Sequence, residues 1–230
     1  MTNSYDVWWQ KGQESDDEMA RDHQEAWERT IEMLDTSDIE GKTILDVGCN
    51  QGGFLRRLYD TTPFKEGVGI DLARLSLEKA ETLKGQRPLT YYLTDKPQET
   101  KHMFDTAVST SVLYLIEDIP KHVKDLKEVL KPGGVYYASF ADLTNNPSRQ
   151  FMDDTINQYG ATPSQNHSLK HIVDSFVDAG FEVAVMKEPV PDVIDLTHYS
   201  DFYLSPNDYL QTLYEESFLI KASVKDGTEK

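Results

Sequence analysis

The sequence has little cysteine, little positive charge and no long apolar run. Its one cysteine, Cys49, allows neither an internal disulfide nor a cysteine-based zinc site, and it suits a reducing compartment. No stretch approaches the roughly 18 consecutive apolar residues that cross a membrane. Residues 1–15 also lack the charged-then-apolar order of a signal peptide. We therefore expect a cytoplasmic protein with no membrane partner and no metal site.

Acidic residues outnumber basic ones by 40 to 23, which gives a formal net charge of -17. The average surface therefore repels phosphate backbones and gains nothing from counterion release, so nucleic acid is not expected as a partner. Solubility is a sufficient explanation of this acidity. The 230 residues, 38% of them hydrophobic, are enough for one domain with a substantial core.

Segments with strand and helix patterns alternate along the chain. Amphipathic helical spacing is found at 18–34, 52–59, 74–85, 120–130 and 168–179. Strand patterns occur at 43–47, 67–71, 89–95, 104–110, 135–140, after Gly180 and at 216–225. Residues 131–134 (KPGG) are expected to end the fourth helix, and Ser168 to cap the last one. The alternation predicts an α/β, doubly wound parallel sheet with helices on both faces.

The turn after the first strand has an unusual composition. It reads Gly-Cys-Asn-Gln-Gly-Gly over 48–53, which lacks the second glycine of a dinucleotide-binding turn, and Asp46 precedes it. A carboxylate here repels a pyrophosphate and favours a cationic ligand, whereas Asn50 can adopt positive φ more readily than most residues. Asp71 ends the second strand, where a carboxylate can accept hydrogen bonds from ribose hydroxyls. The pattern predicts a positively charged nucleoside without phosphates.

Four motifs, ILDVGCNQGGF, GVGIDLA, FDTAVSTSVLYLIED and LKEVLKPGGVYYASF, together resemble the class I S-adenosylmethionine-dependent methyltransferases over roughly residues 40–140, with a similar tail at 167–188. The resemblance implies a seven-stranded sheet with an antiparallel last strand, and S-adenosylmethionine as cofactor, leaving as S-adenosylhomocysteine. It implies that Asp71 binds the ribose, Leu72 lies on the adenine and Asp95 reaches the adenine amino group. It assigns the methionine part to Asp46, Gly48, Cys49, Asn50, Gly52, Ser109 and Thr110. Asn50 departs from the commonest family pattern, which has glycine there.

Each of these residues also has a structural interpretation. An aspartate that ends a strand can simply cap the next turn, which applies to Asp46 and to Asp95. Cys49 is interpreted as a small packing residue within the turn rather than a nucleophile. Ser109 and Thr110 can be no more than a polar strand end. Asp46 gains weight as a ligand-binding residue because Asp71 lies at the expected offset from the turn.

Methyl transfer from a sulfonium is an in-line displacement that depends mainly on positioning. A general base is needed only if the acceptor must lose a proton, and the sequence identifies no catalytic residue. His198 is the histidine to test first as a base, although an ordinary loop histidine is the simpler interpretation. By resemblance Tyr114 faces the methyl end, where it could line the acceptor pocket or belong to the core.

The segments outside the sheet are expected to recognise the acceptor. They are an N-terminal helical cap, 1–40, and lid-like insertions near 141–166 and 189–213 in a methyltransferase domain over 41–230. Trp8 and Trp9 can bind a sulfonium or fix the cap to the body. A cytosine C5 methyltransferase would need a cysteine near the fourth strand, and the only cysteine lies in the first turn. The Asp/Asn-Pro-Pro-aromatic motif of enzymes that methylate nucleic-acid amino groups is absent after the fourth strand. These two absences favour a small-molecule acceptor. The alternatives are a protein or tRNA acceptor, a non-catalytic module acting through a partner, and a dinucleotide-dependent oxidoreductase.

Overall fold

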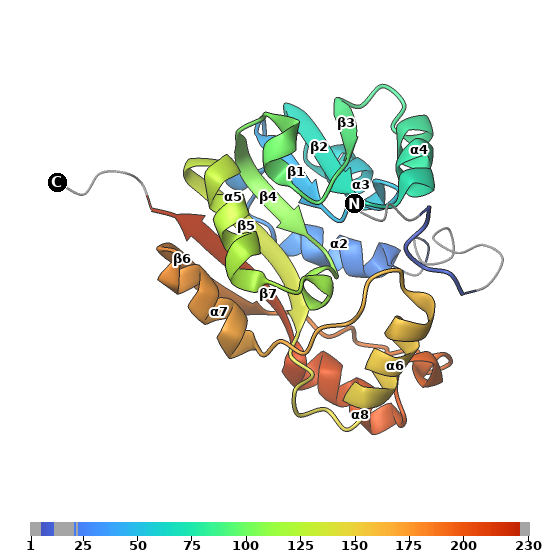
Figure 1. Ribbon diagram of the computed structural model, residues 1–230. Coiled ribbons are helices and arrows are strands. Elements are labelled where there is room, and N and C mark those ends of the chain that lie inside the picture. Colours follow the sequence, from blue (N-terminus) through green and yellow to red (C-terminus); the bar gives the residue numbers. More distant parts are fainter. Residues whose placement is uncertain (1–5, 12–20, 22, 226–230) are drawn as a thin grey trace.

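A seven-stranded sheet forms the centre of the computed structural model, which describes residues 6–11, 21 and 23–225. The strand order is β3-β2-β1-β4-β5-β7-β6, and β7 runs antiparallel to both of its neighbours while the other neighbouring pairs are parallel (Figure 1). The strands are β1 Thr43–Val47, β2 Glu66–Asp71, β3 Leu89–Leu93, β4 Phe104–Ser109, β5 Leu130–Ala141, β6 Phe181–Lys187 and β7 Ser217–Val224. The predicted doubly wound sheet with an antiparallel last strand is confirmed.

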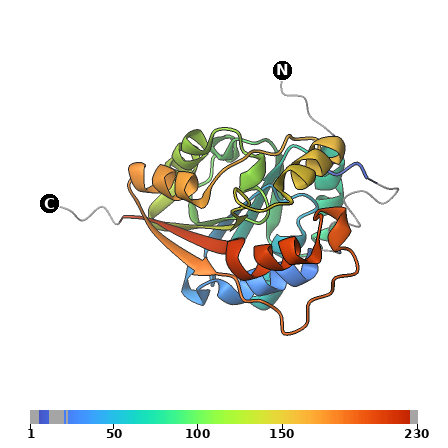
Figure 2. The same cartoon turned by 90° about the horizontal axis from the view of Figure 1, so that it is seen from below.

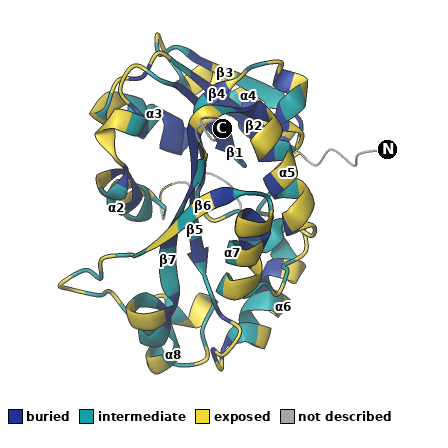
Figure 3. Ribbon diagram, turned by 90° about the vertical axis from the view of Figure 1, so that its left-hand side faces the viewer, coloured by how far each residue is buried: buried dark blue, intermediate teal, exposed yellow. Residues whose placement is uncertain are grey.

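Helices cover both faces of this sheet (Figure 3). One apolar cluster joins the sheet to α2 (Gln24–Met33) and α3 (Gly53–Thr61), and a second joins it to α5 (Ile119–Val129) and α7 (Leu169–Asp178). Helix α4 (Arg74–Leu83) lies beside the edge strand β3. Among the described helices, none combines the length and the apolar composition needed to cross a bilayer.

Three local features test the predicted boundaries. Ser168 caps α7 by accepting a hydrogen bond from the backbone N–H of His171, as predicted. Helix α5 ends at Val129, next to residues 131–134, as predicted. The predicted start of the next strand at 135 is wrong, because β5 begins at Leu130 and residues 131–134 form an irregularity in its pairing with β4. Helix α2 begins at Gln24, and residues 18–20 and 22 of the predicted helix lie outside the described part of the chain.

Two further helices lie beyond the carboxyl ends of the parallel strands. They are α6 (Arg149–Tyr159) and α8 (Pro206–Gln211), which Figure 2 shows on the same side of the molecule. Ser148 links them, since its Oγ donates to Asp208 Oδ2 at 2.5 Å and accepts from the Leu204 N–H at 2.8 Å. The sequence patterns did not predict either helix. They bring the two insertions to one end of the sheet.

The N-terminal segment 6–11 crosses the same end of the sheet. At one end, Asp6 pairs with Arg74 of α4 at 2.7 Å. Farther along, Trp9 forms an isolated antiparallel bridge with Gly160, just after α6. The segment therefore joins the β3 side of the molecule to the first insertion.

Candidate functional site

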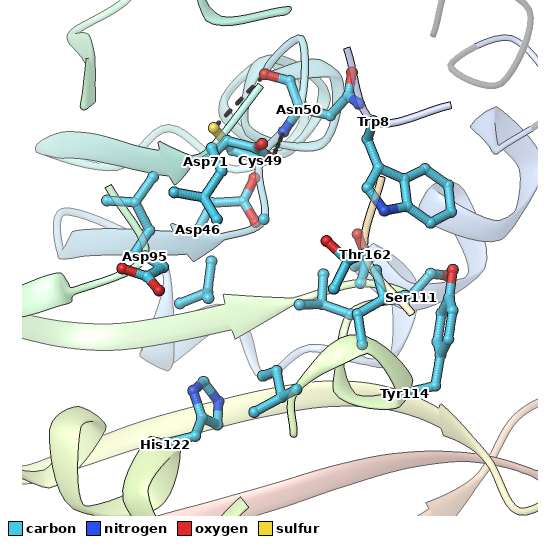
Figure 4. Close-up of a pocket in the computed structure, with 18 of the residues that line it drawn as sticks. Trp8, Asp46, Cys49, Asn50, Asp71, Asp95, Ser111, Tyr114, His122 and Thr162 are labelled. Carbon is cyan, nitrogen blue, oxygen red and sulfur yellow. Dashed lines mark hydrogen bonds between the residues drawn. The ribbon is translucent and has the colours of Figure 1, made fainter. Parts of the chain in front are cut away.

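A cavity of about 450 Å³ lies beyond the carboxyl ends of β1, β2, β3 and β4 (Figure 4). Its floor consists of the turn after β1 and the strand-end carboxylates, and its far wall contains Trp8, Ser111 and Tyr114. Ligands of doubly wound sheets bind in this crevice, where the direction of strand order reverses. Because the order changes direction between β1 and β4, the cavity has the position expected of a ligand site.

The turn after β1 brings backbone close to the cavity. Gly48, Asn50 and Gly52 have φ of +73°, +46° and +68°, so the turn contains three left-handed residues. The expectation that Asn50 adopts positive φ is therefore met, and its Oδ1 also accepts a hydrogen bond from the Gln51 N–H at 2.7 Å. A Cβ on Gly48 would lie 2.6 Å from the Val112 side chain, so the close approach of the turn to the end of β4 requires glycine.

Asp71 holds this turn to the end of β2. Its Oδ2 accepts from the Asn50 N–H and its Oδ1 from the Ala73 N–H, both at 2.8 Å. These two hydrogen bonds fix the orientation of the Asp71 carboxylate at the edge of the cavity. Asp71 thus has the cap interaction that sequence alone allowed, and it also lines the cavity.

Asp46 is a buried carboxylate whose Oδ2 lacks a hydrogen-bond partner within the described structure. The residue is 1% exposed and lines the cavity. Burial, and to a lesser extent the charge of Asp71, raise the pKa of Asp46 well above its ordinary value. A buried carboxylate without a partner destabilises the fold unless a ligand supplies a donor or a positive charge. The cavity is therefore electrostatically prepared for a cation.

The other charged residues that line this cavity are also mainly acidic. The carboxylates that line the cavity outnumber its one lysine, Lys121, which forms an ion pair with Asp125. They are Asp46, Asp71, Asp95, Glu117, Asp118 and Asp125. Burial also lowers the pKa of His122 to about 4, which keeps its ring neutral at physiological pH. A phosphorylated ligand would face repulsion at this surface, and a cationic one attraction.

The structure brings most of the predicted site residues together. Eight of them line the cavity: Asp46, Gly48, Cys49, Asn50, Asp71, Leu72, Asp95 and Thr110. Gly52 and Ser109 are not in the lining. Gly52 shapes the turn as the residue before α3, and Ser109 is buried with its Oγ 2.5 Å from the hydroxyl of Tyr136. Cys49 is buried against Gly69, and burial raises its pKa well above the ordinary value, which disfavours a nucleophilic role.

A second cavity of about 580 Å³ adjoins the first along the same edge of the sheet. It lies beyond the end of β5, the end of β6 and the start of β7. The two cavities share six lining residues: Trp8, His23, Trp27, Thr110, Ser111 and Tyr114. Tyr114, predicted to face an acceptor or to belong to the core, thus stands between the two spaces. A ligand in one cavity can touch a ligand in the other.

Sequence patterns did not single out several of the lining residues. Trp27 was part of a helical stripe, and it packs so closely on the turn that a Cβ on Gly53 would lie 2.5 Å from its ring. Glu188 follows β6 and carries no local motif. His198, the histidine chosen for testing as a base, lines neither cavity and its side chain is 83% exposed. Within the described residues, no group of three or more His, Cys, Asp or Glu could hold a metal ion.

Known proteins match the part of the chain that carries the first cavity. Residues 45–136 match a family model described as a methyltransferase domain. A tRNA U34 carboxymethyltransferase of Klebsiella pneumoniae is 35% identical over 113 residues, which is 47% of this chain and 33% of that protein. The chain thus spans about a third of the length of this curated relative.

Solved structures are similar over nearly the whole chain. The first is a complex between the Haloferax volcanii Trm112 methyltransferase activator and a methyltransferase, which matches with a TM-score of 0.72 and 18% identity over 91% of this chain and 95% of the other. The second is an N-methyltransferase of Bradyrhizobium japonicum in complex with S-adenosylhomocysteine, which matches with a TM-score of 0.55 and 16% identity over 89% of this chain and 86% of the other. At these identities the likeness establishes the fold.

Proposed function

We propose that the protein transfers a methyl group from S-adenosylmethionine to a small-molecule acceptor. The premise is that residues 45–136 of this chain are the core of a class I S-adenosylmethionine-dependent methyltransferase. The family assignment confirms the resemblance found in the four sequence motifs. The observation that carries the proposal is the buried, unpartnered Asp46 oxygen in a cavity lined mainly by carboxylates.

The residues of the first cavity fit this cofactor. Asp46 would hold its positively charged methionine part, which supplies the missing partner for the buried carboxylate. Asp71 would accept hydrogen bonds from the ribose hydroxyls, Leu72 would cover the adenine and Asp95 would reach its amino group.

The cofactor supplies an electrophilic methyl group on a positively charged sulfur. The contribution of this chain is to hold the acceptor in line with that methyl and to exclude water, which together supply several kcal/mol of the barrier reduction. Tyr114, Thr110 and Ser111 stand where the two cavities meet, and we assign them to the alignment of the two substrates. We assign residues 1–40 to a cap, and 141–166 and 189–213 to lids that complete the second cavity.

Calorimetry tests the cofactor assignment directly. S-adenosylhomocysteine should bind in the micromolar range and NAD should not, because the cavity repels a pyrophosphate. Binding of NAD without binding of S-adenosylhomocysteine would replace this proposal with the dinucleotide-dependent alternative. Binding of S-adenosylhomocysteine without methyl transfer in a screen of metabolite pools would favour a non-catalytic module that acts through a partner.

A tRNA acceptor is the second candidate, because a relative that is 35% identical carries that name. The match covers only 47% of this chain and 33% of that protein, however, and the net charge of -17 disfavours a polyanionic substrate. The methyl-transfer screen should therefore include bulk tRNA beside the metabolite pools. Labelling of tRNA and of no small molecule would overturn the choice of acceptor and leave the cofactor assignment in place.

A further inference from the structure

The second cavity has an aromatic wall made from segments that are distant in the sequence. Trp8 and Trp9 come from the N-terminal segment, Trp27 from α2, Phe140 from β5 and Phe202 and Tyr203 from the second insertion. Trp9 connects these segments, since its ring lies 5.4 Å from Trp8, 5.7 Å from Tyr159 and 5.9 Å from Phe202. Aromatic faces carry partial negative charge, so this wall attracts cations as well as apolar groups.

The charged side chains of this cavity are paired with one another except for one. Lys11 pairs with Asp201 at 3.2 Å, and Arg149 Nε donates to Asp153 at 2.6 Å. Asp153 also accepts from the Ser164 hydroxyl at 2.6 Å. Glu188 is the remaining charge, and among the described residues its carboxylate makes neither a hydrogen bond nor an ion pair.

The position of Glu188 follows from the sheet. It directly follows β6, whose carboxyl end lies at the same edge as the ends of β1 and β4, and its N–H donates to the Ser217 carbonyl at the start of β7. The side chain is half-buried, and burial raises the pKa of Glu188 although Arg29 and Lys187 act in the opposite direction. Lys187 turns instead to the Ser217 carbonyl, to which its Nζ donates at 2.9 Å.

We propose that the acceptor carries a protonated amine, which the Glu188 carboxylate binds while the aromatic wall packs against the rest of the molecule. This inference rests on the proposed function, since it names the class of compound methylated in the site. Burial outweighs the attraction of Arg29 and Lys187 at Glu188, so a carboxylate without a hydrogen bond or ion pair in an aromatic cavity gains from a ligand that donates positive charge. A neutral acceptor would replace the lost solvation of Glu188 only in part, and an anionic acceptor would be repelled.

The chain contains its own reporter for this test. Its three tryptophans, Trp8, Trp9 and Trp27, all line the second cavity, and Trp8 and Trp27 also line the first, so intrinsic fluorescence reports on the second space when S-adenosylhomocysteine fills the first. We choose three probes of similar length, namely phenethylamine, phenethyl alcohol and 3-phenylpropionate, and titrate each into the full chain with and without S-adenosylhomocysteine. Phenethylamine should bind at least about tenfold more tightly than the alcohol, because a charge-assisted hydrogen bond replaces a neutral one. The anionic probe, 3-phenylpropionate, should bind most weakly.

Variants of Glu188 identify the group responsible. Glu188→Gln should remove the preference for the amine, and Glu188→Lys should reverse it in favour of 3-phenylpropionate. Glu182→Gln is the matched control, because it removes an exposed carboxylate from the other end of β6. The control should bind all three probes as the unmodified protein does. S-adenosylhomocysteine affinity, measured by calorimetry, should be the same in all four proteins.

The outcomes separate this inference from the proposed function. The inference is wrong if the unmodified protein binds phenethyl alcohol or 3-phenylpropionate as tightly as phenethylamine. It is also wrong if phenethylamine does not bind at millimolar concentration. Neither result depends on the folding of a variant. An amine preference that persists in Glu188→Gln overturns the role of Glu188. Failure to bind S-adenosylhomocysteine contradicts the proposed function, and the comparison with Glu188→Gln without it still decides the amine preference.

Discussion

The two cavities lie side by side at one edge of the sheet, yet they are built differently. The first consists of the ends of four neighbouring strands and the short turns that follow them. The second combines the N-terminal segment, α2, α6, the end of β6 and residues of the second insertion. Local backbone geometry therefore fixes the proposed cofactor side, whereas contacts between distant segments assemble the proposed acceptor side. A short motif can identify the first kind of site, and only the folded chain reveals the second.

The cavities also differ in how they treat charge. Carboxylates dominate the first, and Asp46 remains buried without a partner. In the second, opposite charges neutralise one another, and Glu188 alone is left over. We infer that the first cavity selects its ligand by overall electrostatics and the second by one charged group within an aromatic wall. Substitutions on each side should then have separable effects.

Asp71→Ala should have the largest effect, and on the cofactor side only. It removes the proposed acceptors of both ribose hydroxyls, so S-adenosylhomocysteine affinity should fall by about 100-fold or more, given about tenfold for each hydrogen bond to a charged group. Calorimetry measures this loss, and circular dichroism should show an intact fold. Asp95→Ala, at an exposed carboxylate of the same cavity, is the control and should cost less. Unchanged affinity in Asp71→Ala would show that the ribose assignment is wrong.

Asp46→Asn should weaken binding and stabilise the empty protein. The folded-state pKa of Asp46 is raised, so Asp46 opposes folding above its unfolded-state pKa, and this penalty is lost as pH falls from the folded-state pKa to the unfolded-state pKa. The amide removes the charge, so the free energy of unfolding should rise by about 1 to 3 kcal/mol while cofactor affinity falls about tenfold or more. Thermal unfolding at pH 7 and calorimetry measure the two effects. A variant that loses both stability and affinity would contradict the role of Asp46 as a buried charge awaiting a cation.

His122→Leu should change how stability depends on pH. The pKa of His122 is about 4 in the folded protein and about 6.5 when unfolded. Between these values the unfolded chain binds more protons, so His122 lowers stability as pH falls from about 6.5 to 4 and has no effect above that range. Denaturant unfolding should therefore show that the variant loses about 2.5 kcal/mol less stability than the unmodified protein over this range. His198→Leu, at an exposed side chain outside both cavities, is the control, and an identical slope in His122→Leu would refute the prediction.

The parts of the fold that sequence predicted are those decided locally. The strands and the turn after β1 were predictable because short runs rich in β-branched and apolar residues, three positive-φ positions and strand-end aspartates lie within short windows. Residues 131–134 misled because proline and glycines usually end elements, whereas here pairing with β4 on both sides retains them within β5.

The parts that sequence missed depend on distant contacts. Helices α6 and α8 are held together by contacts between segments about 60 residues apart, such as the hydrogen bonds of Ser148, just before α6, with Asp208 of α8 and with Leu204. Glu188 became a candidate only when folding placed it, without a partner, inside an aromatic cavity. His198 looked similar to the other histidines in sequence, and its exposed position distinguishes it from His122, which lines the first cavity.

Trp9→Ala should have the smallest effect and should separate the two sides most cleanly. Trp9 lines only the second cavity, whereas its neighbour Trp8 lines both. Losing the contacts of Trp9 with Trp8, Tyr159 and Phe202 should cost about 1 kcal/mol of stability and weaken phenethylamine binding a few-fold, with S-adenosylhomocysteine affinity unchanged. Trp8→Ala should weaken both ligands. Calorimetry is the measurement, because each variant removes a fluorophore. If the two variants behave alike, the N-terminal segment acts as one cover over a single site, and the division into a cofactor side and an acceptor side fails at this wall.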